Sequence, residues 1–473
     1  MPKRIILNAF HMNCVVHQSP GLWVLPGNDM ERYTDLETWV SLAKVLEKGH
    51  FDALFLADVT GVYDVFHGNR EAAVSSAAQI PVNDPVALIP AMAHATEHLG
   101  FAWTSSVLYN HPFAFSRTVS TLDHLTKGRV AWNIVTGYLE SGARNFGRSA
   151  LPEHDSRYAI ADEYLEVCYR LWESSWEEGA VVKDRRRGIY ADPAKVHPVD
   201  FDGEHFQIHG VHLAEPSPQR TPVLYQAGSS PRGRTFAAQH AECVFVLGPN
   251  PGVVAQYVTD TRDKARAFGR HPDDVKFLTY VKVITGGTEE EARKKYASLL
   301  DSISYDASMA LLSGWTGIDF GQFKPDQKLE YIETNAVRTL VHGFTDADPT
   351  RSWTLRDLAK YVGIGGAGPV IVGSPEQVAD DLERWMGAGV DGFNLAYATT
   401  PGSFVDFVDG VVPVLERRGL VQRDYQPGTL RQKLYGPAHA RLLDRHPAAK
   451  YRRAFTQVPA TSRFSESAHA AGK

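Results

Sequence analysis

Two histidines and a cysteine lie within seven positions near the start of the chain, in the segment HMNCVVHQSPGLW (11–23). Their types allow three kinds of site: a metal site, a nucleophile with its base, or the wall of a pocket. Cys14 and His17 are three positions apart, but no second cluster supplies the other ligands of a zinc site, so no metal is expected. A Cys–His nucleophile pair would need a third group to orient it. Because the segment follows an apolar, strand-like run, we interpret His11, Cys14 and His17 as part of a pocket wall.

Polar side chains follow several of the buried strands that the sequence predicts. Asp58 ends the apolar run FDALFLAD, Ser106 lies near the end of FAWTSSV, and Thr136 lies near the end of RVAWNIVTG. Ser229 and Ser230 follow PVLYQAG. Each of these side chains alone would be an ordinary loop cap or strand-end group. Because the C-terminal ends of barrel strands form one rim, their recurrence predicts a ligand site at that rim.

Two helix starts carry groups of the kind that bind phosphate. In GSSPRGRTFAAQHA, Ser230 can cap a helix that opens at Pro231, and backbone N–H groups, hydroxyls and arginines then surround the helix N-terminus. An ordinary Ser-Pro helix start is the alternative. The segment EHDSRY (153–158) opens a second helix, with Asp155 expected as its cap, so His154 and Tyr158 project from the first turn. His154 can equally be a surface histidine.

The segment GIGGAG (363–368) has the glycine spacing of a dinucleotide-binding fingerprint. That fingerprint requires a buried strand before it and a helix opening from it. Neither is predicted here, because PVIVG follows directly, so we expect no nicotinamide binding at this segment.

Eight short apolar runs, each followed eventually by an amphipathic helical pattern, predict the architecture. Near-continuous apolar strands indicate a parallel sheet covered on both faces, and eight such units favour an α/β fold of the TIM-barrel type, (β/α)8. A doubly wound open sheet is the alternative. The predicted strands are 4–10, 51–58, 101–107, 129–137, 222–228, 242–248, 275–286 and 391–399.

The chain is predicted to form a single domain, 1–473, with long insertions at the C-terminal rim of the strands. The insertions span about 60–82, 176–220 and 302–369, and a C-terminal extension spans about 420–473. Loops this long inside a compact domain usually carry function. Together with 11–34, the insertions 60–82 and 302–369 are expected to form a lid over the site.

Composition excludes several classes of protein. The net charge of −6 gives no overall basic field, so no nucleic acid partner is expected. No apolar stretch approaches the roughly 18 residues that span a bilayer, and the first residues lack the features of a signal peptide, so no membrane association is expected. Three cysteines lie far apart in the sequence and predict no disulfide framework, which is typical of a cytoplasmic protein.

Several motifs, taken in order, resemble the FMN-dependent monooxygenases of the bacterial luciferase-like superfamily. The closest branch holds the nitrilotriacetate, dibenzothiophene sulfone, dimethyl-sulfide and long-chain alkane monooxygenases. The resemblance rests on segments such as LNAFHMNCVVHQSPGLW, GHFDALFLADVTGVYDV, EHDSRYAIADEYLEVCYRLW and PSPQRTPVLYQAGSSPRGR, and it covers essentially the whole chain. It implies a two-component system that oxygenates a small apolar or sulfur-containing substrate with reduced FMN and O2. A separate NAD(P)H-dependent flavin reductase would supply the reduced FMN, and the chain would form a homodimer or homotetramer.

The resemblance also assigns roles to individual residues. Flavin contacts carry over to Asp58, Ser106, Thr136, Gly137, His154, Tyr158, Ser229 and Ser230. Cys14, His17, Tyr63 and Gln79 match pocket positions of the alkane monooxygenase, and Phe10, Trp23, Tyr63 and Trp315 are candidates for an apolar substrate pocket. Within this site, His17, His11 or Tyr138 can donate a hydrogen bond to the reacting groups, and Cys14 is a further candidate catalytic residue.

Two departures from the alkane enzyme limit the substrate that can be inferred. Gly137-Tyr138 stands where that enzyme has a histidine, and 308–317 contains no histidine. Terminal-alkane oxidation is therefore in doubt. Three other functions stay open: a deazaflavin-dependent oxidoreductase of the same fold, a non-catalytic flavin-binding protein, and a barrel hydrolase with paired carboxylates. Against the hydrolase, Asp58 is the only carboxylate at the predicted strand ends.

Overall fold

The computed structural model describes residues 3–328, 353–366 and 368–457. Within these ranges, eight parallel strands form a closed barrel, because β10 pairs with β11 as well as with β9. The TIM-barrel prediction is confirmed, and closure excludes the open sheet. The barrel strands are β1 (Ile6–Met12), β2 (Ala53–Ala57), β3 (Gly100–Ser106), β4 (Val130–Val135), β9 (Val223–Gln226), β10 (Cys243–Val246), β11 (Lys276–Thr285) and β13 (Gly392–Ala396).

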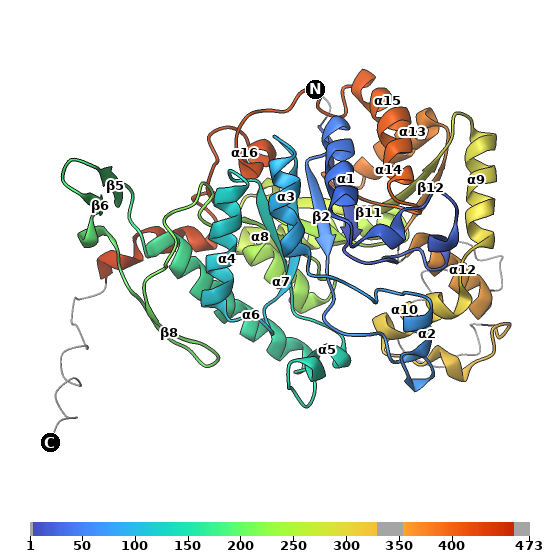
Figure 1. The fold of residues 1–473 in the computed structure, drawn as a ribbon, viewed down its shortest axis with the longest axis horizontal. Helices are drawn as coiled ribbons and strands as arrows, with labels where there is room; N and C mark the ends of the chain where they lie inside the picture. The colour runs from blue at the N-terminus through green and yellow to red at the C-terminus, as the bar shows by residue number, and fades with distance from the viewer. Residues whose placement is uncertain (1–2, 329–352, 367, 458–473) are drawn as a thin grey trace.

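Helices surround the barrel (Figure 1). They are α1 (Leu36–Lys48), α3 (Ile89–His94), α4 (Pro112–Leu125), α6 (His154–Tyr169), α7 (Pro231–His240), α8 (Pro251–Ala267), α9 (Glu289–Asp301), α13 (Pro375–Met386), α14 (Gly402–Asp406) and α15 (Val412–Arg417). The alternation of side chains along the strands separates two cores. Phe10, Phe55 and Tyr225 fill the barrel interior, whereas Leu7 and Leu54 pack against the helices.

The predicted start of α7 is confirmed, because the Ser230 side chain accepts the hydrogen bond that caps this helix. Asp35 and Ser374 cap α1 and α13 in the same way. The prediction that Asp155 caps α6 was wrong, because the helix begins at His154 and Glu153 is its N-cap, with no side-chain hydrogen bond.

The insertions pack against one another at the C-terminal rim. The segment 60–82 contains α2 (Glu71–Ser75), and 302–369 contains α10 (Tyr305–Thr316) and α12 (Leu355–Gly365). Figure 1 shows α2 and α10 side by side, and Tyr63, Phe66 and Leu311 share an apolar cluster separate from the barrel core. The segment 176–220 instead forms two hairpins, β5 (Val181–Asp184) with β6 (Ile189–Ala191) and β7 (Val199–Asp202) with β8 (Gln207–Gly210).

The GIGGAG segment does not form a dinucleotide fold. Gly363 and Gly365 lie at the end of α12, and β12 (Val370–Gly373) follows and pairs with β11 outside the barrel. Ala367 lies outside the described residues. As predicted, these glycines neither follow a strand nor open a helix.

The C-terminal extension covers the opposite end of the barrel, with α16 (Leu430–Tyr435) on the side away from α2 and α5 (Glu140–Asn145) in Figure 1. Leu430 and Leu434 join the apolar cluster inside the barrel. The buried Arg431 guanidinium donates to the Glu242 carboxylate at 2.7 and 2.9 Å and to the carbonyl oxygens of Thr221 and Pro222. The extension therefore closes the N-terminal end of the strands and leaves the other end for the site.

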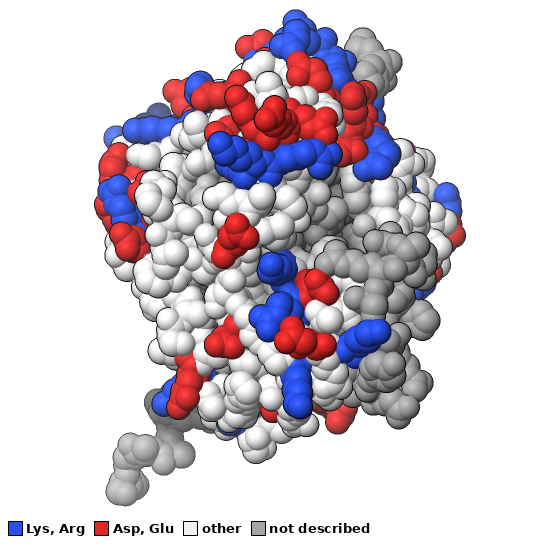
Figure 2. All heavy atoms as spheres, turned by 90° about the vertical axis from the view of Figure 1, so that its right-hand side faces the viewer, with Lys and Arg blue, Asp and Glu red and all other residues white. Residues whose placement is uncertain are grey.

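Charged side chains of both signs are mixed on the face shown in Figure 2. Opposite charges also form ion pairs between helices, since the Arg418 guanidinium pairs with Asp380 at 2.7 Å and Glu383 at 2.5 Å on α13. A mixed surface gives this face no extended basic field that would attract a polyanion. In the part of the chain that the structure describes, no helix combines the length and apolar character needed to cross a membrane.

Candidate active site

A pocket opens at the C-terminal ends of three neighbouring strands, β2, β3 and β4. Four predicted residues line it: Asp58, Ser106, Gly137 and Tyr138. Gly137 has φ +73°, a conformation that disfavours other residues, so the chain can turn sharply where β4 ends. Residues separated by about eighty positions in the sequence thus lie in one pocket, at the strand ends where the ligand site is predicted.

Asp58 is the carboxylate of this pocket. Burial raises the pKa of its carboxyl to about 7, and the negative charge of Asp84 acts in the same direction, against a backbone hydrogen bond from Val59. Near neutral pH, Asp58 can therefore accept or donate a hydrogen bond toward a ligand.

We expect Asp58→Asn to stabilise the protein above pH 7. A carboxyl whose pKa is raised on folding binds its proton more tightly when folded, so the free energy of unfolding falls as pH rises from about 4 through about 7. Each pKa unit corresponds to about 1.4 kcal/mol, and allowing for partial solvent access we expect a gain of roughly 2 kcal/mol at pH 8. Urea unfolding of both proteins at pH 5 and pH 8 measures this. A difference that does not change with pH would contradict the assignment.

Three further predicted residues meet at the start of α7. The Tyr158 hydroxyl interacts with the side chains of Ser230 and Thr136, and burial raises the pKa of this phenol although both hydrogen bonds oppose the rise. The Ser230 hydroxyl accepts a hydrogen bond from the Gly233 N–H at 3.0 Å. A Cβ at Gly233 would lie 2.7 Å from the Tyr158 oxygen, so only glycine leaves space there. Hydroxyls thus gather at a helix N-terminus, which favours an anion such as phosphate.

The remaining predicted flavin contacts lie beside this corner. Ser229 is exposed, and its carbonyl oxygen accepts from Arg234 at 3.2 Å. His154 is exposed, with its ring 5.3 Å from that of Tyr158 and its Nδ1 2.7 Å from an Asp155 oxygen. Nearby, the Gln226 Oε1 is buried without a hydrogen-bond partner among the described residues, and a Cβ at Gly228 would meet the same amide at 2.2 Å. The corner therefore combines a backbone cradle with an unsatisfied buried polar atom.

A chain of hydrogen bonds connects the pocket with the segment that follows β1. The hydroxyls of Tyr63 and Tyr138 lie 2.5 Å apart, and Tyr63 also donates to Gln79 Oε1 at 2.9 Å. Trp315 Nε1 donates to the Tyr63 oxygen at 3.2 Å, and Gln79 donates to the carbonyl oxygen of His17 at 2.7 Å. These hydrogen bonds therefore join four segments of the chain that were predicted to contribute to the site.

His17 is buried, and its ring contacts Phe10 edge-on with centroids 4.6 Å apart. Its Nδ1 has no hydrogen-bond partner among the described residues. Burial and the charges of His11 and Lys282 hold the pKa of His17 well below its usual value, so the ring is neutral at neutral pH. Burial raises the pKa of the Cys14 thiol, as does the Asp58 carboxylate, which favours a protonated thiol over a nucleophilic thiolate.

The sequence profile of the luciferase-like monooxygenases matches residues 14–392. The chain belongs to this family. It is 50% identical over 456 residues to the dimethyl-sulfide monooxygenase of Hyphomicrobium sulfonivorans, covering 96% of this chain and 95% of that protein. It is 48% identical over 459 residues to the long-chain alkane monooxygenase of Geobacillus thermodenitrificans (strain NG80-2), covering 97% and 100%.

A solved structure agrees with this assignment. The crystal structure of riboflavin lyase with modified FMN and its substrate riboflavin superposes with a TM-score of 0.86 at 35% identity, covering 95% of this chain and 100% of that one. The resemblance found in the sequence is confirmed, and by homology the protein is a monooxygenase.

In this luciferase-like monooxygenase, two predicted pocket residues lie elsewhere. The His11 ring points to the helix layer, where it stacks on Tyr397 with centroids 4.1 Å apart, and its Nδ1 accepts the Met12 N–H at 2.9 Å. Burial lowers the pKa of His11 to about 4. Trp23 packs against the helix-side core. Neither residue lines the pocket that Asp58 lines, and the same holds for six other predicted residues: Phe10, Cys14, His17, Tyr63, Gln79 and Trp315.

Sequence reasoning missed Lys282, which lies buried on β11. Its ammonium group donates to the Gln18 carbonyl oxygen at 3.1 Å and to the Ser19 hydroxyl at 2.7 Å, so it ties β11 to the segment that carries His17. Burial lowers the pKa of Lys282 to about 7. The signal was present in the sequence, because a lysine interrupts the apolar run 275–286.

Proposed function

We propose that this luciferase-like monooxygenase is the oxygenase of a two-component system and uses reduced FMN and O2. A separate NAD(P)H-dependent flavin reductase would supply the reduced FMN, and the substrate is a small apolar or sulfur-containing organic molecule. The proposal rests on one observation, which is that two features of the site lie at the same rim of the barrel. One is the pocket of Asp58, Ser106 and Gly137, and the other is the hydroxyl cluster of Tyr158 and Ser230 at the start of α7. A ring system with a phosphate tail matches this pair of features.

The residues present fit FMN. Ser230, Tyr158 and the N-terminus of α7 would hold the phosphate, and the cradle at Gly228 and Gly233 gives it room. Asp58, Ser106 and Gly137 would contact the ring system. The relative solved with modified FMN supports this choice of cofactor.

Bound in its reduced form, FMN supplies the electrons that activate O2. The protein's part is to orient, to exclude water and to place hydrogen bonds. Tyr63 and Trp315 are joined by a hydrogen bond and would help the insertions to keep solvent from the pocket. His17 is neutral, and its Nδ1 has no partner in the described part of the chain, so it would hold or accept a proton at that atom as oxygen is added to the substrate.

Tyr138 bears on the choice of substrate. Its side chain is exposed, its hydroxyl lies 2.5 Å from the Tyr63 hydroxyl, and a phenol with its ordinary pKa of about 10 is protonated at neutral pH. Because Tyr138 replaces the histidine expected of an alkane enzyme, we propose a thioether or other sulfur compound ahead of a terminal alkane.

A single-turnover experiment tests the proposed function. The protein is mixed with chemically reduced FMN, O2 and a panel of thioethers, sulfones, alkanes, aminopolycarboxylates and flavins, and products are screened by mass for an added oxygen atom. Product with one added oxygen supports the proposal. Turnover with a reduced deazaflavin and without O2 would instead identify an oxidoreductase, and flavin binding without any turnover would identify a binding protein.

We expect Ser230→Ala to weaken FMN binding about tenfold, because one hydroxyl at the phosphate corner is lost. It should also lower the free energy of unfolding by about 1 kcal/mol through loss of the N-cap of α7. Ser374→Ala is the matched control, since Ser374 also caps a helix, α13, ahead of a proline. The control should show the loss of stability without the loss of FMN affinity. Equal FMN affinity in both variants would argue against the phosphate site.

A further inference from the structure

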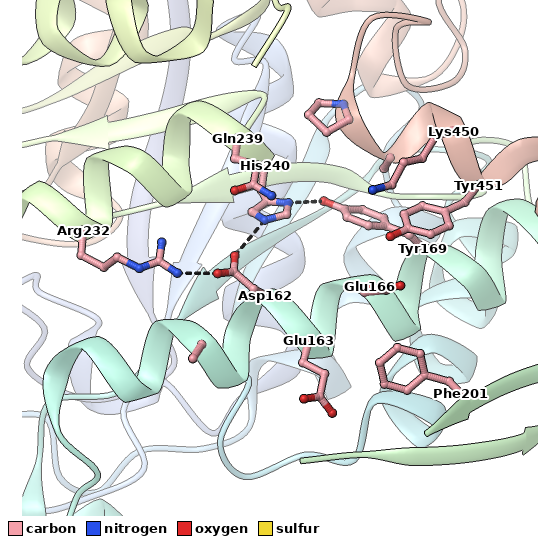
Figure 3. A pocket seen from close by; sticks show the side chains of 13 residues that line it. Asp162, Glu163, Glu166, Tyr169, Phe201, Arg232, Gln239, His240, Lys450 and Tyr451 are labelled. Atoms are coloured by element: carbon pink, nitrogen blue, oxygen red, sulfur yellow. Dashed lines mark hydrogen bonds and ion pairs between the residues drawn. The ribbon is translucent and has the colours of Figure 1, made fainter. Parts of the chain in front are cut away.

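Outside the barrel, a cavity between α6, α7 and the C-terminal extension contains a row of paired side chains (Figure 3). Arg232 from α7 points to Asp162 on α6 and forms an ion pair with it. The other Asp162 oxygen accepts from His240 Nε2 at 3.0 Å, and His240 Nδ1 lies 3.2 Å from the Tyr169 hydroxyl. A neutral histidine satisfies both contacts, because Nε2–H donates to the carboxylate and Nδ1 accepts from the phenol.

The charges in this row are balanced. Burial acts to raise the pKa of the Asp162 carboxyl, but the hydrogen bonds from His240 and Arg232 and the positive charge of Arg232 outweigh it and bring the pKa below its ordinary value. One helical turn on, the Glu166 carboxylate accepts from Arg170 at 2.6 Å. Among the described residues, Asp162 and Glu166 are therefore both paired, and neither carboxylate is free for a cationic ligand.

The same guanidinium of Arg232 also contacts Tyr158. The guanidinium lies over the ring of Tyr158, 5.3 Å from its centroid, and Phe236 packs against the same ring at 5.4 Å. Asp162 follows Tyr158 by four positions on α6, so both face α7. Asp162 fixes the guanidinium, and the guanidinium fixes the ring. The Tyr158 hydroxyl then reaches Ser230 and Thr136 at the start of α7.

We infer that Asp162 and Arg232 form a clamp that positions the Tyr158 hydroxyl for the phosphate of FMN, and so set the preference for FMN over riboflavin. The inference rests on the proposed function, since it concerns the phosphate corner of the same site. Both are positioning residues, because they act through Tyr158. Arg232 is held by a carboxylate rather than left free, which distinguishes a clamp from an arginine that binds phosphate directly.

The test compares binding of oxidised FMN and of riboflavin, which lacks the phosphate, to the full-length chain by quenching of flavin fluorescence. We expect Arg232→Met and Asp162→Asn each to weaken FMN binding about tenfold and to change riboflavin binding less than twofold. Glu166→Gln is the matched control, since it breaks the Glu166–Arg170 pair in the same cavity and should change neither affinity. Circular dichroism verifies that each variant is folded.

A double-variant cycle separates the clamp from a general structural effect. Once Tyr158→Phe has removed the hydroxyl, Asp162→Asn should cause no further loss of FMN affinity. Additive losses, equal weakening of both flavins, or tighter FMN binding by Asp162→Asn would each overturn the clamp; the last outcome would mean that Asp162 only neutralises Arg232. Equal affinity of the unmodified protein for FMN and riboflavin would instead overturn the phosphate site and with it the proposed function.

Discussion

Replacing His17 by alanine is expected to slow oxygenation about 100-fold while leaving FMN affinity within twofold. A single well-placed hydrogen-bonding group contributes about 3 kcal/mol to lowering a reaction barrier. His17 has the features of such a group, since its ring is buried, neutral at neutral pH and unpartnered at Nδ1 among the described residues. The proposed phosphate contacts, Tyr158 and Ser230, lie on other segments, so flavin binding should survive.

Single-turnover rates with chemically reduced FMN, together with an FMN titration, separate the two effects. His212→Ala is the matched control, because His212 is also buried and neutral but bonds to Ser120 on α4, at 2.9 Å. Both variants remove a buried imidazole and should lose similar stability. Equal loss of rate in the two variants, or parallel loss of rate and FMN affinity in His17→Ala, would make the role of His17 structural.

The barrel was predictable because each strand is a short apolar run, and each of the eight predicted runs overlaps a barrel strand. The ninth strand, β12, was missed. It has four residues, and within the described ranges it pairs with the end of β11 alone, so its position depends on a partner that is distant in sequence. The periodicity of apolar residues reports local structure, whereas the pairing of β12 with β11 joins segments far apart in the sequence.

The candidate site was predictable as far as strand ends determine it. Asp58, Ser106 and Gly137 line one pocket because parallel strands end at one rim. For His11, the direction of the side chain was not predicted correctly. The first run was expected to end at residue 10, but β1 continues through Met12 in register with Ala57. Since side chains alternate along a strand and Phe10 points inward, His11 must point to the helices.

The buried ion pair between Arg431 and Glu242 carries the largest expected effect on stability. Arg431→Met is expected to lower the free energy of unfolding by about 3–5 kcal/mol, because the Glu242 carboxylate is left buried without its cation. Urea unfolding followed by tryptophan fluorescence measures the change. Arg293→Met, which removes an exposed pair with Glu289 on α9, is the control and should cost less than about 1 kcal/mol. A loss below about 1 kcal/mol for Arg431→Met would contradict the assignment.

A double variant tests whether the cost comes from the unpaired charge. Removing both charges, as in Arg431→Met with Glu242→Gln, should recover most of the stability lost by Arg431→Met alone. Recovery should stay incomplete, because the guanidinium also bonds the carbonyl oxygens of Thr221 and Pro222 just before β9. Glu242 in turn accepts the Leu224 N–H at 3.0 Å, a contact that the glutamine oxygen can retain. Since these bonds tie α16 to the strands that lead to Ser230, loss of the pair should also weaken FMN binding as the barrel loosens.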